Sequence, residues 1–121
     1  VVMCHIDDTG FNLDFQRSVM NRGAYVEYDS FGSEIYYDSI NAYEPHDTQR
    51  VDAVLKLVEE GFVSQLLLSQ DVCFKIHLKK YGGYGYDHIL KHILPMMRQR
   101  GMKEEDICLM LVRNPTKVLT T

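Results

Sequence analysis

Two short apolar segments of this chain each end on a residue type that can bind a metal ion. Residues 1–4 are Val-Val-Met-Cys and lead into His5, and residues 65–70 are Gln-Leu-Leu-Leu-Ser-Gln and lead into Asp71. Short apolar runs of this kind are typical of strands buried in a parallel sheet. Because active sites of (β/α) barrels lie at the C-terminal ends of their strands, we interpret His5 and Asp71 as candidate metal ligands at one edge of such a sheet.

Each of these candidates also has an interpretation without a metal. His5 could be a core histidine that hydrogen-bonds the neighbouring strand. Asp71 would be costly if it were buried alone, so it must meet a metal, a cation or hydrogen-bond donors, or lie exposed at the strand end. Asp7 and Asp8, which follow His5 closely, could simply cap the next helix.

Two further features lie in the second half of the chain. His88 and His92 have the i, i+4 spacing of a chelating pair on a helix, but no third ligand is spaced with them, which favours a solvated helix face. Residues 81–86 read Tyr-Gly-Gly-Tyr-Gly-Tyr, and this density of glycine indicates a tight backbone and close packing.

The composition limits the class of protein. The chain has 121 residues, of which 45% are apolar and 25% charged, as in a globular domain or part of one. The net charge of −4 argues against a nucleic-acid partner. No apolar stretch approaches the roughly 20 residues of a membrane helix. Three cysteines without close spacing indicate reduced thiols, so we expect a cytoplasmic protein.

The hydrophobic pattern alternates between strand and helix. Strands are predicted at residues 1–5, 24–29 and 65–70, in that spatial order, and long loops at residues 30–45 and 72–85. Such alternation is typical of βαβ units around a parallel sheet. Three strands cannot close a barrel, which needs about 250 residues. We therefore predict part of a (β/α) barrel, with His5 and Asp71 as candidate metal ligands.

Helices are predicted between and after these strands. Apolar spacing predicts the first helix near residues 11–20, the second after a cap at Asp47, and a third over residues 89–101 that Pro95 kinks. A further helix is predicted over residues 103–112. Asn114 is expected to cap a restarted helix, with Pro115 at its first position.

Several segments resemble the phosphotriesterase family of the amidohydrolase superfamily. Residues 4–9, Cys-His-Ile-Asp-Asp-Thr, resemble its sixth-strand His-x-Asp-Asp-Thr, and residues 23–29 resemble its seventh strand. Residues 68–71 resemble its eighth-strand Ser-x-Asp, and residues 113–119 its closing Asn-Pro motif. Residues 78–90 are similar to the phosphotriesterase-related (phosphotriesterase homology) branch. The resemblance covers nearly the whole chain, in the family's order.

The resemblance implies a fold, a cofactor and residue roles. Residues 1–121 would form the C-terminal part of a (β/α)8 TIM barrel, strands 6–8 with their helices, with the N-terminal part missing. The family implies two divalent ions, usually zinc, that activate water. His5 would bind the more exposed ion and Asp71 the more buried one. Asp71 would also accept a proton from the attacking water, and Asp8 would pass that proton outward.

Some family features have no counterpart here. The first-strand His-x-His, the bridging carboxylated lysine and the fifth-strand histidine would lie before Val1. Ser30 follows the seventh strand, where relatives carry a histidine or an arginine, which weakens both the paraoxonase-like and the lactone-selective interpretations. We expect a zinc-dependent hydrolase of small esters, lactones or amides, inactive as this chain alone.

Two alternatives remain open at this point. The first is a non-catalytic binding protein on the same fold. The second is a small stand-alone α/β domain in which His5 and Asp71 are ordinary polar groups at strand ends. A small-molecule substrate is expected, without nucleic acid or membrane partners, and a homodimer is left open.

Overall fold

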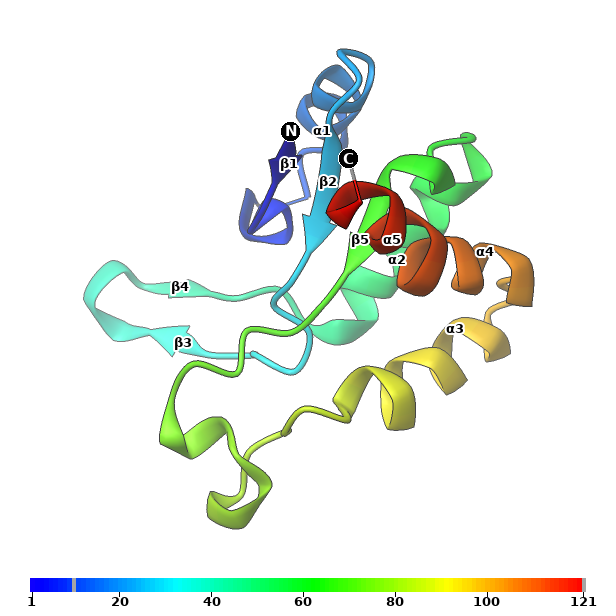
Figure 1. Ribbon diagram of the computed structural model, residues 1–121. Coiled ribbons are helices and arrows are strands. Elements are labelled where there is room, and N and C mark those ends of the chain that lie inside the picture. Colours follow the sequence, from blue (N-terminus) through cyan, green and yellow to red (C-terminus); the bar gives the residue numbers. More distant parts are fainter. Residues whose placement is uncertain (10, 121) are drawn as a thin grey trace.

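Three parallel strands form the sheet around which the chain is built. The computed structural model describes residues 1–9 and 11–120. The strands lie in the order β1 (Val2–Met3), β2 (Tyr25–Tyr28) and β5 (Leu66–Leu68) (Figure 1). Each neighbouring pair is parallel, which confirms the predicted direction and order of the strands. The carboxyl ends of the strands therefore meet at one edge.

Helices fill the segments between and after the strands. The α-helices are α1 (Leu13–Met20), α2 (Asp47–Glu59), α3 (Leu94–Gln99), α4 (Glu104–Cys108) and α5 (Asn114–Leu119). A π-helical turn at Ile89–Ile93 runs directly into α3. Pro95 has no backbone N–H and cannot make the i→i−4 hydrogen bond of an α-helix. The π-helical turn lies directly before this position, where that bond is missing. Among the described residues, no helix is long and apolar enough to cross a membrane.

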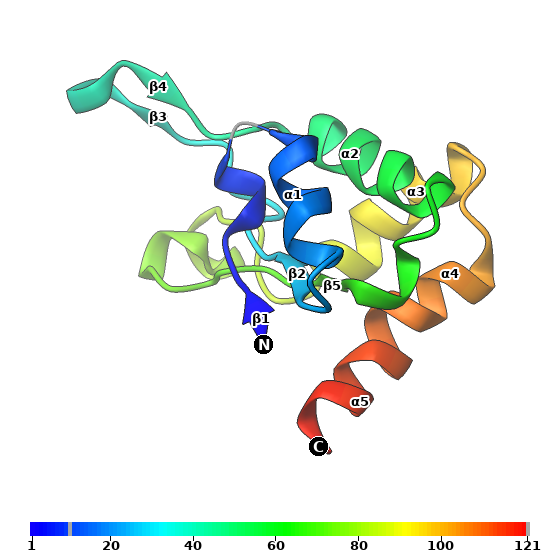
Figure 2. The same ribbon diagram turned by 90° about the horizontal axis from the view of Figure 1, so that it is seen from above.

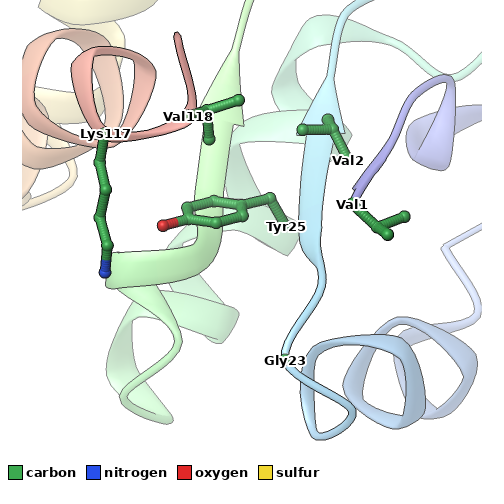
Figure 3. Close-up of a pocket in the computed structure, with 6 residues that line it drawn as sticks. All are labelled: Val1, Val2, Gly23, Tyr25, Lys117 and Val118. Atoms are coloured by element: carbon green, nitrogen blue, oxygen red, sulfur yellow. The ribbon is translucent and has the colours of Figure 1, made fainter. Parts of the chain in front are cut away.

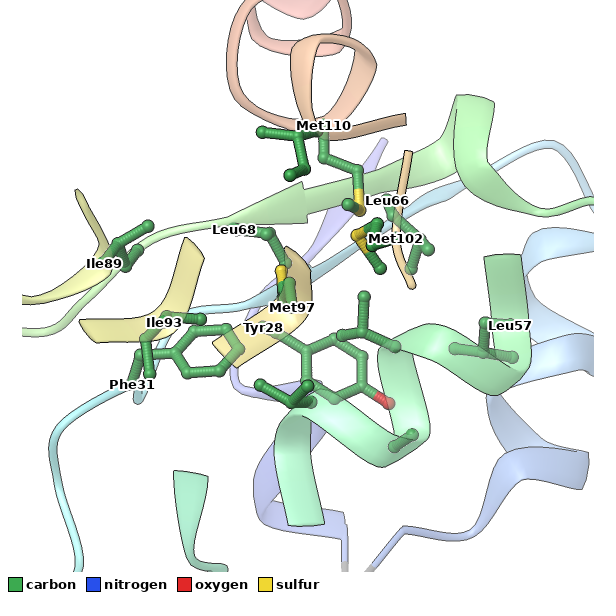
Figure 4. Packing of buried hydrophobic residues seen from close by; sticks show 14 of the residues in the cluster. Tyr28, Phe31, Leu57, Leu66, Leu68, Ile89, Ile93, Met97, Met102 and Met110 are labelled. Atoms are coloured by element: carbon green, nitrogen blue, oxygen red, sulfur yellow. The ribbon is translucent and has the colours of Figure 1, made fainter. Parts of the chain in front are cut away.

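The hydrophobic core lies between the sheet and the helices (Figure 4). Val26 and Tyr28 of β2 and Leu66 and Leu68 of β5 belong to one buried cluster, as the alternation of side chains along a strand requires. From the helices and the turns beside them, the cluster includes Met20, Val51, Ala53, Val54, Leu57, Ile89, Ile93, Leu94, Met97, Met102, Ile107 and Met110. This packing fixes β2 and β5, and therefore the loops that follow them.

The predicted loop after the second strand contains a hairpin. Strands β3 (Tyr36–Tyr37) and β4 (Ala42–Tyr43) pair antiparallel and extend away from the body (Figure 2). The sequence prediction of an irregular loop was wrong here. Tyr36, Tyr37 and Tyr43 are all exposed, so the segment lacks the buried alternation that predicts a strand.

Two predicted helix caps were also wrong. His46, not Asp47, is the N-cap residue of α2, and its backbone N–H donates to the Gln49 side chain. Asn114 has helical dihedral angles, because a π-helical turn at Leu109–Arg113 continues into α5 without a break. The Asn114 amide instead donates to the carbonyl oxygens of Val63 and Leu66, and thereby ties this helix to the start of β5.

Candidate metal centre

A small cavity lies where the carboxyl ends of the three strands meet. It encloses about 120 Å³ and contains both predicted ligands, His5 and Asp71, together with Asp8. Its other lining residues come from the loops that follow β2 and β5: Ser30, Ser33, Ile35, Tyr37, Glu44, Cys73, Phe74 and His77. The structure therefore brings together the three residues that the sequence singled out for metal binding and proton transfer.

His5 adopts a backbone conformation that is uncommon for a residue with a side chain. Its φ is 52°, in the left-handed region, and its backbone N–H lies 3.1 and 3.0 Å from the two carboxylate oxygens of Asp29. Its Nδ1 lies 3.1 Å from Asp29 Oδ1. A carboxylate on one ring nitrogen fixes the tautomer and leaves the other nitrogen free to bind a metal.

Asp29 is the site residue that the sequence analysis missed. It directly follows β2 and is buried, and burial is the main cause that raises the pKa of its carboxyl to about 6. The hydrogen bond from the His5 backbone opposes this shift, whereas the charge of Asp7 adds to it. The signal was available, because a carboxylate directly after a buried strand is the same pattern that identified Asp71.

Asp8 lines the cavity beside His5 and Asp71. Desolvation is the main cause that raises the pKa of its carboxyl, and the charges of Asp7 and Glu44 add to this effect. Its Oδ1 lies 3.5 Å from the Ser30 hydroxyl. A carboxylate with a raised pKa accepts a proton more readily near neutral pH than an ordinary surface aspartate does.

Asp7 points away from the cavity and into the protein. Its Oδ2 accepts hydrogen bonds from the Ser30 backbone N–H at 3.2 Å and from Arg50 Nε at 2.8 Å. Arg50 also donates to the Ser33 carbonyl oxygen and to Asp47 Oδ1. Asp7 is thus not a helix cap. It links the first and second strand ends to α2.

The helical histidine pair has a different environment from the one predicted. His88 is only half-exposed, and its Nε2 lies 2.7 Å from Asp47 Oδ2. His92 is exposed, and the two rings have their centroids 5.1 Å apart. The prediction of a solvated face therefore holds for His92 and was wrong for His88, which is paired with a buried carboxylate.

The described residues contain one close group of three potential ligand atoms, and it is not the predicted pair. It consists of Cys4, Glu27 and Asp29, whose ligand atoms lie within 4.8 Å of one another. Cys4 Sγ donates to Glu27 Oε2 at 3.4 Å, and this hydrogen bond is the main cause that raises the pKa of the thiol. Because metals bind the thiolate, this arrangement disfavours Cys4 as a ligand.

A larger pocket lies at the opposite end of the sheet (Figure 3). It encloses about 440 Å³ and is lined by Val1, Val2, Gly23, Tyr25, Lys117 and Val118. Val1, Val2, Gly23 and Tyr25 lie at the amino ends of β1 and β2, and Lys117 and Val118 belong to α5. The amino ends of the strands in (β/α) barrels serve stability rather than catalysis. Its size therefore does not make it the candidate site.

The chain belongs to the phosphotriesterase family, whose sequence model matches residues 1–119. It is 42% identical over 120 residues to the phosphotriesterase-related protein of Drosophila melanogaster, covering 98% of this chain and 34% of that protein. It is 40% identical over 125 residues to N-acetyltaurine hydrolase of Danio rerio, covering 98% of this chain and 35% of that protein. The chain thus spans about a third of the length of these curated relatives.

Solved structures show the same relationship. A resiniferatoxin-binding protein from Rhodobacter sphaeroides matches with a TM-score of 0.92 and 33% identity, over 97% of this chain and 33% of that one. The phosphotriesterase homology protein from Escherichia coli, complexed with phosphate in its active site, matches with a TM-score of 0.85 and 33% identity, over 97% of this chain and 37% of that one. The predicted family and the predicted partial barrel fold are both confirmed.

Proposed function

We propose that this chain is the C-terminal part of a metal-dependent hydrolase in which His5 and Asp71 bind two divalent ions, usually zinc in this family. The observation that carries the proposal is that His5 and Asp71 line the same cavity at the carboxyl ends of parallel strands. An imidazole nitrogen and a carboxylate oxygen are ligand types that zinc accepts. When bound, such ions supply Lewis acidity and lower the pKa of water.

The ligand set of this chain is incomplete by itself. Catalytic zinc takes about three protein ligands, and His5 and Asp71 supply one to each ion. We propose that the remaining ligands come from the part of the barrel that precedes strand β1 in the relatives. The contact between Asp29 and His5 Nδ1 supports the assignment of His5, because metal-binding histidines commonly donate their second ring N–H to a carboxylate.

The carboxylates of the cavity would move the proton. Asp71 would accept it from the attacking water, and Asp8 would pass it outward. The raised pKa of the Asp8 carboxyl supports its role as the second acceptor, because a proton is then held there more readily. Both residues line the cavity, so the transfer needs no distant group.

The bond that is hydrolysed would be an ester, a lactone or an amide of a small molecule. The relative in Danio rerio is named as a hydrolase of N-acetyltaurine, which contains a secondary amide. Its 40% identity to this chain extends over the segments that form the cavity. These observations support a carbonyl substrate rather than a phosphotriester.

The alternative is a binding protein on the same fold. It is favoured by the structural match to the resiniferatoxin-binding protein of Rhodobacter sphaeroides. A barrel that lacks the other metal ligands would keep the cavity as a binding site but would not hydrolyse a substrate. The two functions differ in metal content and in turnover, so a single set of measurements separates them.

The test replaces Asp71 by Asn in the full-length protein. Asp71→Asn keeps the shape of the side chain and removes its charge and most of its basicity, so kcat should fall by about 10²–10⁴-fold. Metal content, measured by plasma emission spectroscopy, should also decrease. The control is Asp14→Asn, because Asp14 is an exposed residue of α1 and pairs only with Arg17 among the described residues.

The outcomes separate the proposals. Equal activity of the Asp71→Asn and Asp14→Asn variants would make Asp71 a structural residue. A wild-type protein that retains no divalent metal and hydrolyses no ester, lactone or amide, yet binds a small molecule, would support the binding protein instead.

A further inference from the structure

The segment of residues 81–86, rich in glycine and tyrosine, contacts Asp71 through Tyr84. The Tyr84 hydroxyl donates a hydrogen bond to the backbone carbonyl oxygen of Asp71 at 2.8 Å. The same carbonyl oxygen lies 3.2 Å from Nδ1 of the buried His77 ring. It also accepts the backbone N–H of Cys73 at 3.0 Å. Three donors therefore meet at one backbone atom of the residue whose side chain is a proposed metal ligand.

The directions of these hydrogen bonds follow from the chemistry of the three groups. A carbonyl oxygen only accepts, so His77 Nδ1 carries the proton of the neutral ring. The Tyr84 hydroxyl oxygen lies 3.1 Å from Nδ1, so it can accept from the ring while its own proton goes to the carbonyl oxygen. The hydroxyl, the ring nitrogen and the Asp71 carbonyl oxygen thus form a closed set, and each atom is restrained by the other two.

Glycines allow the backbone to come close enough for this arrangement. A Cβ on Gly83 would lie 2.1 Å from the carbonyl carbon of His77, so only glycine fits there. The Gly85 backbone N–H donates to the His77 carbonyl oxygen at 2.8 Å. A Cβ on Gly32 would lie 2.5 Å from the Tyr84 ring, so the loop after β2 packs directly on this ring. Tyr84 therefore lies between the loops that follow β2 and β5.

We infer that Tyr84 is a positioning residue that acts through the backbone of Asp71 and holds the Asp71 carboxylate in place before a metal ion binds. The inference rests on the proposed metal-binding role of Asp71. The Asp71 side chain is exposed, so few neighbours restrain it and its backbone largely sets where the carboxylate can lie. A ligand that is held beforehand loses less conformational freedom on binding, and the ion then binds more tightly.

A second connection keeps this loop folded when the Tyr84 hydroxyl is removed. The side chain of Gln70, one residue before Asp71, donates from Nε2 to the Gly85 carbonyl oxygen at 2.9 Å. Its Oε1 accepts the Ile89 backbone N–H at 3.1 Å. Loss of the hydroxyl should therefore loosen the Asp71 backbone without unfolding the segment around it.

The inference is tested by the zinc affinity of the full-length protein, measured by competition with a fluorescent chelator. Tyr84→Phe keeps the ring against Gly32 and removes only the hydroxyl. Asp71→Asn identifies which of the two zinc-binding steps depends on Asp71. We expect Tyr84→Phe to weaken that same step about 10-fold and to change the other step less than about threefold.

Matched variants separate hydrogen bonding from packing. Tyr86→Phe is the control, because Tyr86 belongs to the same segment and is 74% exposed, and it should leave both zinc-binding steps unchanged. His77→Asn places an amide N–H near the Nδ1 position and should keep most of the zinc affinity. His77→Leu fills the space without a donor, so it should weaken the step that depends on Asp71.

A measurement on the metal-free protein shows whether the effect precedes metal binding. The Cys73 N–H donates to the same carbonyl oxygen, so its hydrogen exchange reports on the Asp71 backbone. Mass spectrometry of the peptide that contains Cys73 should show exchange about threefold faster or more in Tyr84→Phe than in Tyr86→Phe. Equal exchange in the two variants would show that the hydroxyl does not restrain the Asp71 backbone, and the inference would be wrong.

The zinc measurements distinguish this inference from the proposed function. If Asp71→Asn weakens one zinc-binding step and Tyr84→Phe weakens neither, the inference is wrong and the proposed function stands. If Tyr84→Phe weakens both steps equally, its effect is a general loosening, and the inference is again wrong. If Asp71→Asn leaves both steps unchanged, the proposed role of Asp71 as a metal ligand is wrong, and so is the inference that depends on it.

Discussion

Arg50 Nε lies 2.8 Å from Asp7 Oδ2, and both side chains are fully buried. The pair joins α2 to the end of the first strand, where Asp7 lies between His5 and Asp8 in sequence. Asp7 Oδ1 and Arg50 Nη2 have no hydrogen-bond partner among the described residues, although Glu44 Oε2 lies 3.9 Å from Nη2. Arg50 is the cation paired with Asp7, while Arg50 itself also forms an ion pair with Asp47, whose Oδ1 lies 3.2 Å from Nη1.

Loss of Arg50 should destabilise the protein strongly. Arg50→Met removes the charge that compensates Asp7 and leaves a buried carboxylate unpaired, which costs about 3–5 kcal/mol of unfolding free energy. Urea denaturation of the full-length protein, followed by circular dichroism, measures this loss. The double variant Arg50→Met/Asp7→Asn should regain part of it, because Asn keeps an acceptor for the Ser30 N–H without the charge.

An exposed arginine provides the control for this prediction. Arg98 pairs with Glu104 at the surface, where solvent screens the interaction. Arg98→Met should therefore change stability much less than Arg50→Met. If the two variants were equally stable, the buried pair would contribute no more than a surface pair, and the compensation argument would be wrong.

A second stability prediction concerns the hydroxyl of Tyr28. It donates to Gln16 Oε1 at 2.6 Å, and both residues have no exposed surface. Tyr28→Phe keeps the ring in the core but leaves the Gln16 oxygen without its donor, which should cost about 1–3 kcal/mol. Thermal unfolding measures the change. Tyr43→Phe is the control, since Tyr43 is 74% exposed, and an equal effect there would refute the reasoning.

The sheet and its site edge were predictable from the sequence because local patterns determine them. The apolar runs before His5 and Asp71 predict strands, and parallel strands must present their carboxyl ends together. The expected burial is found for β5 but not for β1, where Met3 is 36% exposed. Tyr25–Tyr28 combines β-branched and aromatic residues, so its strand was also clear. These strands and their carboxyl ends depend on neighbouring residues in the sequence, so they can be predicted without knowledge of the tertiary contacts.

The features that escaped prediction depend on partners far away in sequence. Asp7 and Arg50 are 43 residues apart. Asp47 does not cap its helix, and its Oδ1 instead accepts a hydrogen bond from the Gly32 N–H, 15 residues before it. The position of Asp29 directly after a buried strand was visible in the sequence, but its partner was not, because its role is defined by the contact with His5, 24 residues away. No periodicity or cap rule carries such information, because each side chain is locally compatible with several roles.

Two adjacent glycines, Gly82 and Gly83, should respond differently to replacement by alanine. Gly83→Ala forces a Cβ into the His77 backbone, so the loop must shift, at a cost of about 1–3 kcal/mol, and the His77 ring must move with it. Gly82 has a φ of 90° but open space around it, so Gly82→Ala stores strain without displacing His77. Activity below the unfolding temperature should therefore fall about tenfold more in Gly83→Ala. Equal activity losses would show that the close approach at Gly83 does not position the site.

The last prediction concerns the carboxylate that orients His5. Asp29→Asn keeps an acceptor for the His5 backbone N–H but removes the negative charge beside Nδ1. Loss of such a partner typically weakens metal binding about 10- to 100-fold. Competition with a fluorescent chelator in the full-length protein measures the zinc dissociation constant.

Glu27→Gln is the matched variant, because Glu27 belongs to the Cys4 group but does not contact His5 in any described hydrogen bond. Its affinity should stay near that of the wild type, and an equal loss in both variants would place the metal at the Cys4 group instead of at His5.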